Sequence, residues 1–180
     1  MIFTTKELIG KGESKYSIRT KVSNGTLYLV ERGIYSDDPL FEIDEVYASK
    51  KYPEAILTGL SAFYLYDLTD QIPDNFYFAT QQHSFPIRKD GFVQSYQDES
   101  FFRVGAVVKR IGSGDVVTYD LERMLIELFR LKEKYPKDLY FEVLESFRKI
   151  KSELDFYKIN CYLKCFSNGR TLLERIKESI

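Results

Sequence analysis

Residues Met1–Ser36 read MIFTTKELIGKGESKYSIRTKVSNGTLYLVERGIYS, and this stretch predicts two short helices followed by two strands. Thr4–Glu7 has the spacing of a capping box, in which a hydroxyl and a carboxylate each accept the other residue's backbone N–H. Gly10–Gly12 predicts the end of the first helix, because glycine tolerates the left-handed conformation of a tight helix exit. Ser14–Ser23 then predicts a second helix with a serine N-cap.

The residues after the second helix predict a β-hairpin. Asn24-Gly25 is a turn signal, Thr26–Val30 predicts a strand, and Ile34-Tyr35 predicts the returning strand. Glu31-Arg32-Gly33 forms the predicted tip between them. Two helices joined by a tight turn and followed by a hairpin predict a winged helix-turn-helix.

The second predicted helix has two different faces. At 100° per residue, Ile18 and Val22 share one side and form its apolar stripe. Hydroxyl and guanidinium groups on the other side can meet base edges, and flanking lysines can neutralise phosphates. The residues that we predict to contact DNA, including one at the hairpin tip, are Lys15, Tyr16, Ser17, Arg19, Thr20, Lys21 and Arg32. The alternative interpretation is a solvated basic face on two short helices and a hairpin.

Charge and composition fit this division. The chain has 180 residues, a formal net charge of -1, and 44% hydrophobic residues, as expected for an ordinary globular protein. Residues 1–35 nevertheless hold six basic residues against three acidic ones, so a basic head precedes a slightly acidic body. No apolar run approaches the length of a membrane span and no secretion leader is evident, which predicts a cytoplasmic protein. Cys161 and Cys165 are interpreted as half-buried thiols, and neither a disulfide nor a metal site is expected.

Beyond residue 38 the pattern is mixed. Helices are predicted for Asp44–Tyr52, for a segment that starts at Pro53 and runs to about Asp67, and for a strongly amphipathic segment after Asp120. Further elements are predicted as follows: strands at Phe76–Ala79, Val104–Ile111 and Val116–Tyr119 (the last two about Gly112-Ser113-Gly114), and helices after Pro136, at Phe156–Phe166 and at Leu172–Ile176. The predicted fold class is α+β: a winged helix-turn-helix over residues 1–38, apparently without its first helix, then a mixed α/β domain over 39–180 that ends in a helical part.

No catalytic constellation is predicted in the body. His83, the single histidine, lies in a polar segment, and Gly112-Ser113-Gly114 is too short for a phosphate-binding loop and lacks the following lysine. Asp120 and Glu122 are better explained as acids at a helix N-terminus. The basic residues of the last helices are interleaved with acids, which is typical of solvated faces, and the alternative is a contact patch on one face; they are Arg123, Arg130, Lys132, Arg148, Lys149, Lys151, Lys158 and Lys164. We therefore expect no enzyme, no cofactor and no metal.

Three blocks of the sequence resemble the AbiEi family of antitoxins. The first comprises Phe3–Leu8, Ser14–Tyr16 and Glu31–Tyr35, with the sequences FTTKEL, SKY and ERGIY. The second is Ala55–Pro73, AILTGLSAFYLYDLTDQIP, and the third is Val117–Leu125, VTYDLERML. The blocks follow one another over nearly the whole chain, which makes the resemblance more specific than the helix-turn-helix pattern alone.

The resemblance implies an antitoxin and transcriptional autorepressor of a type IV toxin–antitoxin, phage abortive-infection system. The implied partners are operator DNA, as inverted repeats upstream of its own operon, and an AbiEii-type nucleotidyltransferase toxin that is neutralised without requiring a stable complex. The N-terminal winged helix would bind the operator, and residues 39–180 would neutralise the toxin. No membrane partner is implied, and a monomer in solution that binds DNA cooperatively fits the resemblance.

The sequence departs from the family pattern before Phe3, where members usually carry a further helix that completes the core of the winged module. We therefore expect Leu8, Ile9, Ile18 and Val22 to need cover from the second domain or from another chain. Two alternatives stay open: an antitoxin that acts without binding DNA, and a nuclease-like enzyme whose carboxylates converge in a pocket.

Overall fold

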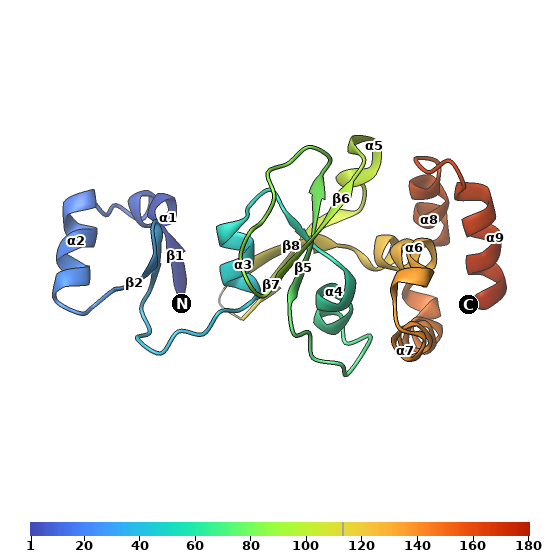
Figure 1. Ribbon diagram of the computed structural model, residues 1–180, viewed down its shortest axis with the longest axis horizontal. Helices are drawn as coiled ribbons and strands as arrows, with labels where there is room; N and C mark the ends of the chain where they lie inside the picture. The colour runs from blue at the N-terminus through green and yellow to red at the C-terminus, as the bar shows by residue number, and fades with distance from the viewer. Residues whose placement is uncertain (113) are drawn as a thin grey trace. The chain divides into compact units, whose positions relative to one another are not determined.

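The computed structural model describes residues 1–112 and 114–180 and has a mixed α+β fold, as predicted. Its contacts divide the chain into two units (Figure 1). The first unit comprises Met1–Pro53 and Val108–Val116, and the second comprises Glu54–Val107 and Val117–Ile180. The predicted boundary at residue 38 is not tested by this division, which places residues 39–53 with the N-terminal module (residues 1–38). The predicted turn at Gly112–Gly114 contains Ser113, which lies outside the described residues.

The N-terminal module contains two helices and a three-stranded antiparallel sheet with the order β1-β3-β2. Its elements are β1 (Ile2–Thr4), α1 (Thr5–Gly10), α2 (Lys15–Ser23), β2 (Tyr28–Glu31) and β3 (Ile34–Ser36). The capping box is confirmed, because the Thr4 side chain accepts the N–H of Glu7 and the Glu7 side chain accepts the N–H of Thr4. The Ser14 cap is confirmed too, since its hydroxyl accepts the N–H of Ser17 at 3.0 Å. Strand β1 was not predicted.

The core of the N-terminal module is small and comes from the module itself. Leu8 on α1, Ile18 on α2 and Leu27 before β2 are buried together. Phe3, Val22 and Tyr35 pack against them, so sheet residues cover the helices from within the same chain segment. The expectation that this cluster depends on a second domain or another chain is therefore wrong for Leu8, Ile18 and Val22. Ile9 does not join the cluster, because it is 46% exposed.

A short helix follows the module within the first unit. Helix α3 (Glu45–Lys51) is capped by Asp44, whose carboxylate accepts the N–H of Tyr47 at 2.7 Å. Val46, Tyr47 and Ala48 are buried, whereas Lys50 and Lys51 are only half-buried at the C-terminal end. This helix agrees with the predicted segment, and its two lysines contact acids of the N-terminal module.

A five-stranded mixed sheet with the order β6-β5-β4-β8-β7 organises the rest of the chain. Strand β5 (Phe76–Gln81) runs antiparallel to β4 (Ile56–Leu57) and parallel to β6 (Phe92–Gln97). Strand β8 (Gly114–Tyr119) runs parallel to β4, and its Thr118 hydroxyl donates to the Leu57 carbonyl at 3.0 Å. Strand β7 (Ala106–Ile111) forms the edge. The outer parts of β7 and β8 belong to the first unit.

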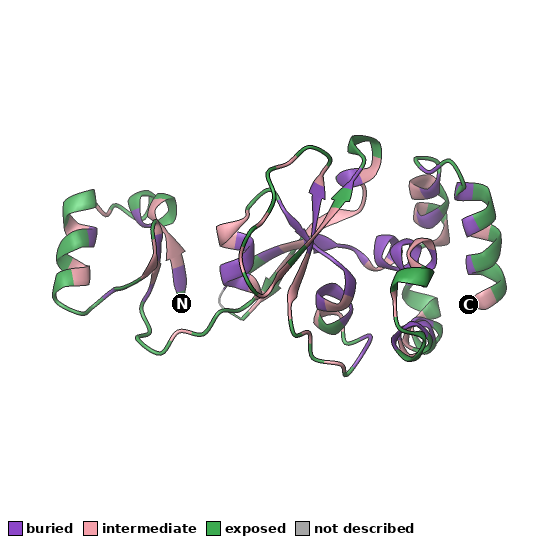
Figure 2. Ribbon diagram, in the orientation of Figure 1, coloured by how far each residue is buried: buried purple, intermediate pink, exposed green. Residues whose placement is uncertain are grey.

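The second unit ends in a group of helices around α6 (Leu121–Arg130), which is buried on almost every side (Figure 2). Its core includes Met124, Leu125 and Leu128 of α6 together with apolar residues of the surrounding helices. The remaining elements of the unit are α4 (Gly59–Leu65), α5 (Glu99–Phe102), η1 (Lys132–Lys134), α7 (Lys137–Lys149), η2 (Lys151–Glu153), α8 (Phe156–Leu163) and α9 (Gly169–Ser179).

In the second unit, one predicted helix is wrong and one strand was missed. The continuous helix from Pro53 to about Asp67 is instead strand β4 followed by helix α4. Ile56 and Leu57 are fully buried and pair with strands on both sides, so sheet formation outweighs their fit to a helical pattern. Strand β6 was also missed, because its side chains are mostly polar or exposed and show little of the apolar pattern that marks a strand.

Arg123 is the largest correction among the charged residues. The sequence pattern placed it on a solvated face, yet both Arg123 and Glu127 have 0% exposed side chains and lie 2.9 Å apart. The Arg123 guanidinium also donates to the carbonyls of Phe101 at 2.6 Å and Val104 at 2.7 Å. Arg123 therefore ties α6 to the segment that follows α5.

Two smaller findings complete the fold. Cys161 is half-buried, as predicted, whereas Cys165 is exposed, and both are free thiols. Within residues 1–112 and 114–180, no helix is both long and apolar enough to cross a lipid bilayer.

Candidate nucleic-acid interface

Helix α2 presents most of the predicted contact residues to solvent. Lys15, Tyr16, Arg19 and Thr20 are all exposed, and Tyr16 is 80% exposed. Ile18, on the opposite side of the helix, is buried in the module's core, which fixes the direction of the outward face. With its side chains, an α-helix is about 10–12 Å across, similar to the roughly 12 Å width of the major groove. Helix α2 is therefore narrow enough to enter a groove with its outward face toward the bases.

Two other predicted residues on α2 are already held by a neighbouring acid. Glu13 accepts hydrogen bonds from the Ser17 hydroxyl and the Lys21 ammonium group. These bonds, that of Lys21 first, lower the pKa of Glu13 below its ordinary value, so the carboxylate is charged at neutral pH. Ser17 and Lys21 are also half-buried. They therefore support the start and flank of α2 and are less available to a ligand than Tyr16 or Arg19.

Two further acids of the module are paired with lysines of α3. Glu7 binds Lys50, and Glu31 lies 2.5 Å from Lys51. Partial burial alone would raise the pKa of Glu7, but the hydrogen bonds from Lys50 and from the Thr4 N–H lower it overall. The hydrogen bond to Glu31 raises the pKa of Lys51. Glu7 and Lys51 are thus charged at neutral pH, and each of the two acids is offset by a cation from outside the module.

This pairing leaves an excess of positive charge on the module. Within the described part of the chain, five of its cations form no ion pair with a carboxylate: Lys6, Lys11, Lys15, Arg19 and Arg32. Lys11 lies over the Phe3 ring, 4.2 Å from its centroid, so it is held near the sheet without losing its charge. An anion that approaches the module therefore meets cations that no acid of the described chain has already neutralised.

Arg32 lies at the hairpin tip, as predicted, and is exposed. The tip is fixed to the start of α1, because the Thr5 N–H donates to the Gly33 carbonyl at 2.9 Å. Gly33 has a φ of +87°, a left-handed conformation that favours glycine at this turn. Arg32 is thus carried by an anchored turn, although it belongs to a different element from the α2 residues.

Sequence reasoning missed the residues that set the charge balance of this surface. Lys50 and Lys51 lie in the last turn of α3, a position that favours cations at any helix end, so nothing marks them as partners of the module. Glu7 is 43 residues before Lys50, and such a long-range pair has no local signature in a single sequence. Glu13 was counted as an acid of the module, but its contacts with Ser17 and Lys21 require the helix geometry.

The other candidate groups lie elsewhere. His83 is exposed in the loop after β5, with a φ of +71°. Asp120 caps α6, as predicted, and also accepts hydrogen bonds from Lys158 at 2.9 Å and from the Tyr162 hydroxyl at 2.8 Å. Glu122 contacts the same lysine at 3.1 Å. Among the residues that the structure describes, no group of three or more His, Cys, Asp or Glu side chains could hold a metal ion.

The chain was compared with known proteins in two ways. Neither a scan against models of protein families nor a search of curated proteins finds a match. The geometry of the module and the resemblance of the three sequence blocks are therefore the basis for a functional assignment.

Proposed function

We propose that the chain is a DNA-binding antitoxin and transcriptional autorepressor of a type IV toxin–antitoxin system, acting in the cytoplasm. The observation that carries the DNA-binding part is the set of cations on the N-terminal module that no acid offsets. Cations on the outward face of α2 lie beside Tyr16 and Thr20, so phosphate neutralisation and contact with base edges are available on one surface.

The order of elements supports a winged helix. The sequence β1-α1-α2-β2-β3, with the sheet order β1-β3-β2, is the arrangement typical of that fold. In a helix-turn-helix, the second helix enters the major groove and its N-terminal residues contact the bases. By this reading α2 is the recognition helix, with Tyr16, Arg19 and Thr20 as base contacts and with Lys15 and Arg32 as phosphate contacts.

The experiment that tests DNA binding compares the DNA upstream of the chain's own gene with a shuffled sequence of the same composition. Fluorescence anisotropy with the full chain should show tighter binding to the upstream DNA, and the affinity should fall steeply as salt rises. Equal affinity for the two sequences at every salt concentration would exclude an operator-specific repressor.

Arg19→Ala should weaken binding to the upstream DNA by about 1–3 kcal/mol, because a guanidinium contact to a base edge is lost. Binding to shuffled DNA should change much less. Lys177→Ala, which removes an exposed lysine from α9 in the second unit, is the matched control and should leave both affinities unchanged. Circular dichroism should show both variants folded, since each side chain is exposed. An Arg19→Ala variant with unaltered operator affinity would remove α2 as the recognition helix.

Toxin neutralisation is proposed for the second unit, which has a large core of its own. The full chain carrying Arg19→Ala and Arg32→Ala should lose operator binding yet still protect cells from a nucleotidyltransferase toxin encoded beside it. Loss of both properties in this folded variant would contradict the proposed division. The alternative, an antitoxin that does not bind DNA, predicts protection by the unaltered chain with no operator binding at all.

A further inference from the structure

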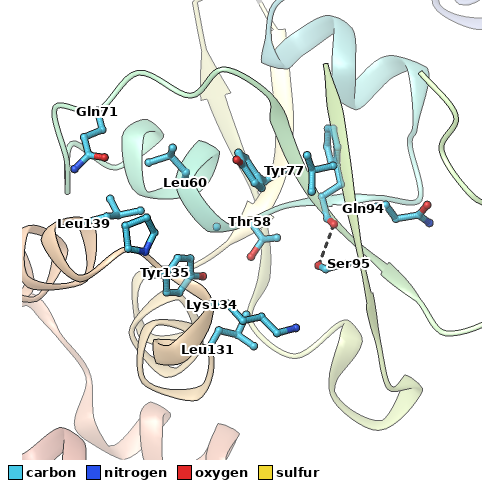
Figure 3. A pocket seen from close by; sticks show the side chains of 14 residues that line it. Thr58, Leu60, Gln71, Tyr77, Gln94, Ser95, Leu131, Lys134, Tyr135 and Leu139 are labelled. Carbon is cyan, nitrogen blue, oxygen red and sulfur yellow. Dashed lines mark hydrogen bonds between the residues drawn. The ribbon is translucent and has the colours of Figure 1, made fainter. Parts of the chain in front are cut away.

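A pocket of about 390 Å³ lies in the second unit (Figure 3). It is formed by residues at the start of α4 and on β5 and β6 on one side, and by the segment Leu131–Leu139 on the other. Pockets of roughly 300–1,000 Å³ are typical of small-molecule sites. Its size thus admits a ligand of one or two rings.

The walls of the pocket are mainly apolar. The lining side chains that offer flat or branched hydrocarbon surfaces include Leu60, Tyr77, Val93, Leu131, Pro136 and Leu139. Apolar walls of this kind favour a hydrophobic ligand body, because its burial removes apolar surface from water on both sides.

Three hydroxyl groups face this space in Figure 3, from Thr58, Ser95 and Tyr135. Thr58 is buried, yet its hydroxyl donates only to the Met124 Sδ at 4.0 Å, a weak acceptor, and it does not cap α4. Ser95 donates to the Phe78 carbonyl at 3.1 Å, which leaves its lone pairs free to accept. The Tyr135 hydroxyl has no hydrogen-bond partner among the described residues. Burial, and after it the Glu127 carboxylate, raises the pKa of Tyr135, so the phenol remains a donor at neutral pH.

Among the lining residues, which belong to the described chain, Lys134 carries a charge and no carboxylate is present. Behind the lining, Glu127 and Arg130 act on Tyr135 with opposite signs. Lys134 forms no ion pair within residues 1–112 and 114–180, and it is exposed at the rim. A ligand cation would meet repulsion here, whereas a ligand anion could pair with Lys134 and accept the Tyr135 hydrogen bond.

We propose that this pocket binds a small aromatic carboxylate, with its rings against Tyr77 and Leu131 and its carboxylate at Lys134 and Tyr135. The apolar walls select the ring body, and the single cation with an unpartnered hydroxyl selects the anionic end. No residue of this site is a proposed DNA contact, so a test of ligand binding here does not depend on the proposed function.

The experiment titrates the full chain with 1-naphthoate, followed by ligand-observed and amide NMR. For a ligand of this size, the dissociation constant should be about millimolar. The neutral analogue 1-naphthalenemethanol should bind several-fold more weakly, and the cation 1-naphthylmethylamine more weakly still. No binding of 1-naphthoate at about ten times that concentration, or preferential binding of the amine, would overturn the proposal.

Two variants locate the probe. Lys134→Gln should weaken 1-naphthoate binding about fivefold and leave the alcohol unchanged, because only the anion uses the lysine. Lys137→Gln is the matched control: this lysine is also exposed and lies three residues along, but it does not line this pocket and lines instead a hollow on another side of Tyr135. Val93→Phe should block both probes by filling the pocket. Equal weakening by Lys134→Gln and Lys137→Gln, or unaltered binding to Val93→Phe, would place the probe elsewhere and contradict the site.

Discussion

The N-terminal module and helix α6 of the second unit differ in the burial and pairing of their charged residues. On the module, five cations form no ion pair within the described chain and sit on exposed elements over a core of three buried residues. In α6, Arg123 and Glu127 are fully buried, and each contacts several partners. A charged side chain that is buried and paired holds neighbouring elements together, whereas an exposed one without a partner is available to a ligand.

The same contrast extends to how the two regions are stabilised. The module's core is small, so its stability depends on a few apolar contacts, two helix caps and the pairs with Lys50 and Lys51. The core around α6 draws on residues from most elements of the second unit. Four predictions test this contrast, from the largest expected effect to the smallest.

Arg123→Met should produce the largest loss of stability, about 3 kcal/mol or more, because it removes one of the two cations that pair with the buried Glu127, leaving Arg130, and takes the donor away from the carbonyls of Phe101 and Val104. Urea unfolding followed by circular dichroism measures the change. The double variant Arg123→Met/Glu127→Leu should recover part of the loss. Arg170→Met is the matched control, since its pair with Glu174 is exposed, and should cost little. Similar stabilities for Arg123→Met and Arg170→Met would refute a structural role for the buried pair.

Ile18→Ala should destabilise the N-terminal module by about 2–4 kcal/mol, because it removes one of the three fully buried members of a small core. Amide hydrogen exchange should show faster exchange along α2, with α6 unchanged. Val22→Ala, on the same stripe but only partly buried, should have a smaller effect. If α6 amides exchanged faster to the same extent as those of α2, the two units would not be separately stabilised.

Glu142 provides a pH-dependent test within the second unit. It accepts hydrogen bonds from the Thr69 hydroxyl at 2.7 Å and the Asp70 N–H at 2.8 Å, and these lower the pKa of Glu142 from 4.5 despite partial desolvation. Because the pKa is lower in the folded state, the stabilisation is present above about pH 4.5 and is lost as the pH falls through the lowered value.

Glu142→Gln should therefore flatten the acid limb of the stability–pH curve and change little at pH 7 beyond the loss of the charged hydrogen bonds. Urea midpoints measured between neutral and acid pH report the effect. Glu145→Gln, an exposed acid on the same helix, is the control. An acid limb as steep in Glu142→Gln as in the unaltered chain would show that this carboxylate does not contribute to it.

The smallest expected effect concerns Glu13. Glu13→Gln removes the acid that holds Lys21, and it should raise affinity for DNA roughly two- to fivefold at low salt, because one more cation is left unneutralised. The gain should vanish as salt increases. Glu145→Gln on the second unit again serves as the control and should not change DNA affinity. Weaker DNA binding by Glu13→Gln would instead mean that Glu13 matters chiefly as the support of α2.

Local signals predicted much of the N-terminal module. The caps at Thr4 and Ser14, the helix ends and the hairpin follow from side-chain chemistry within a few residues, so they can be read without the fold. Strand β1 was missed because three residues carry no period of their own and become a strand only through pairing with β3. The exposure of Tyr16 and Arg19 was also predictable, since Ile18 fixes which side of α2 faces inward.

The class of fold, the helix caps, the apolar stripes and the identity of the outward residues on α2 can be predicted from the order of residues, because each depends on neighbours close in the chain. Which charges remain available depends on the folded packing. Glu7 pairs with Lys50, Glu31 with Lys51, and Glu13 with Lys21. Arg123 is buried in the core, where it pairs with Glu127. The energy of a charge depends on its solvation and on partners within a few ångströms, and the longest-range of these contacts form only after the chain has folded.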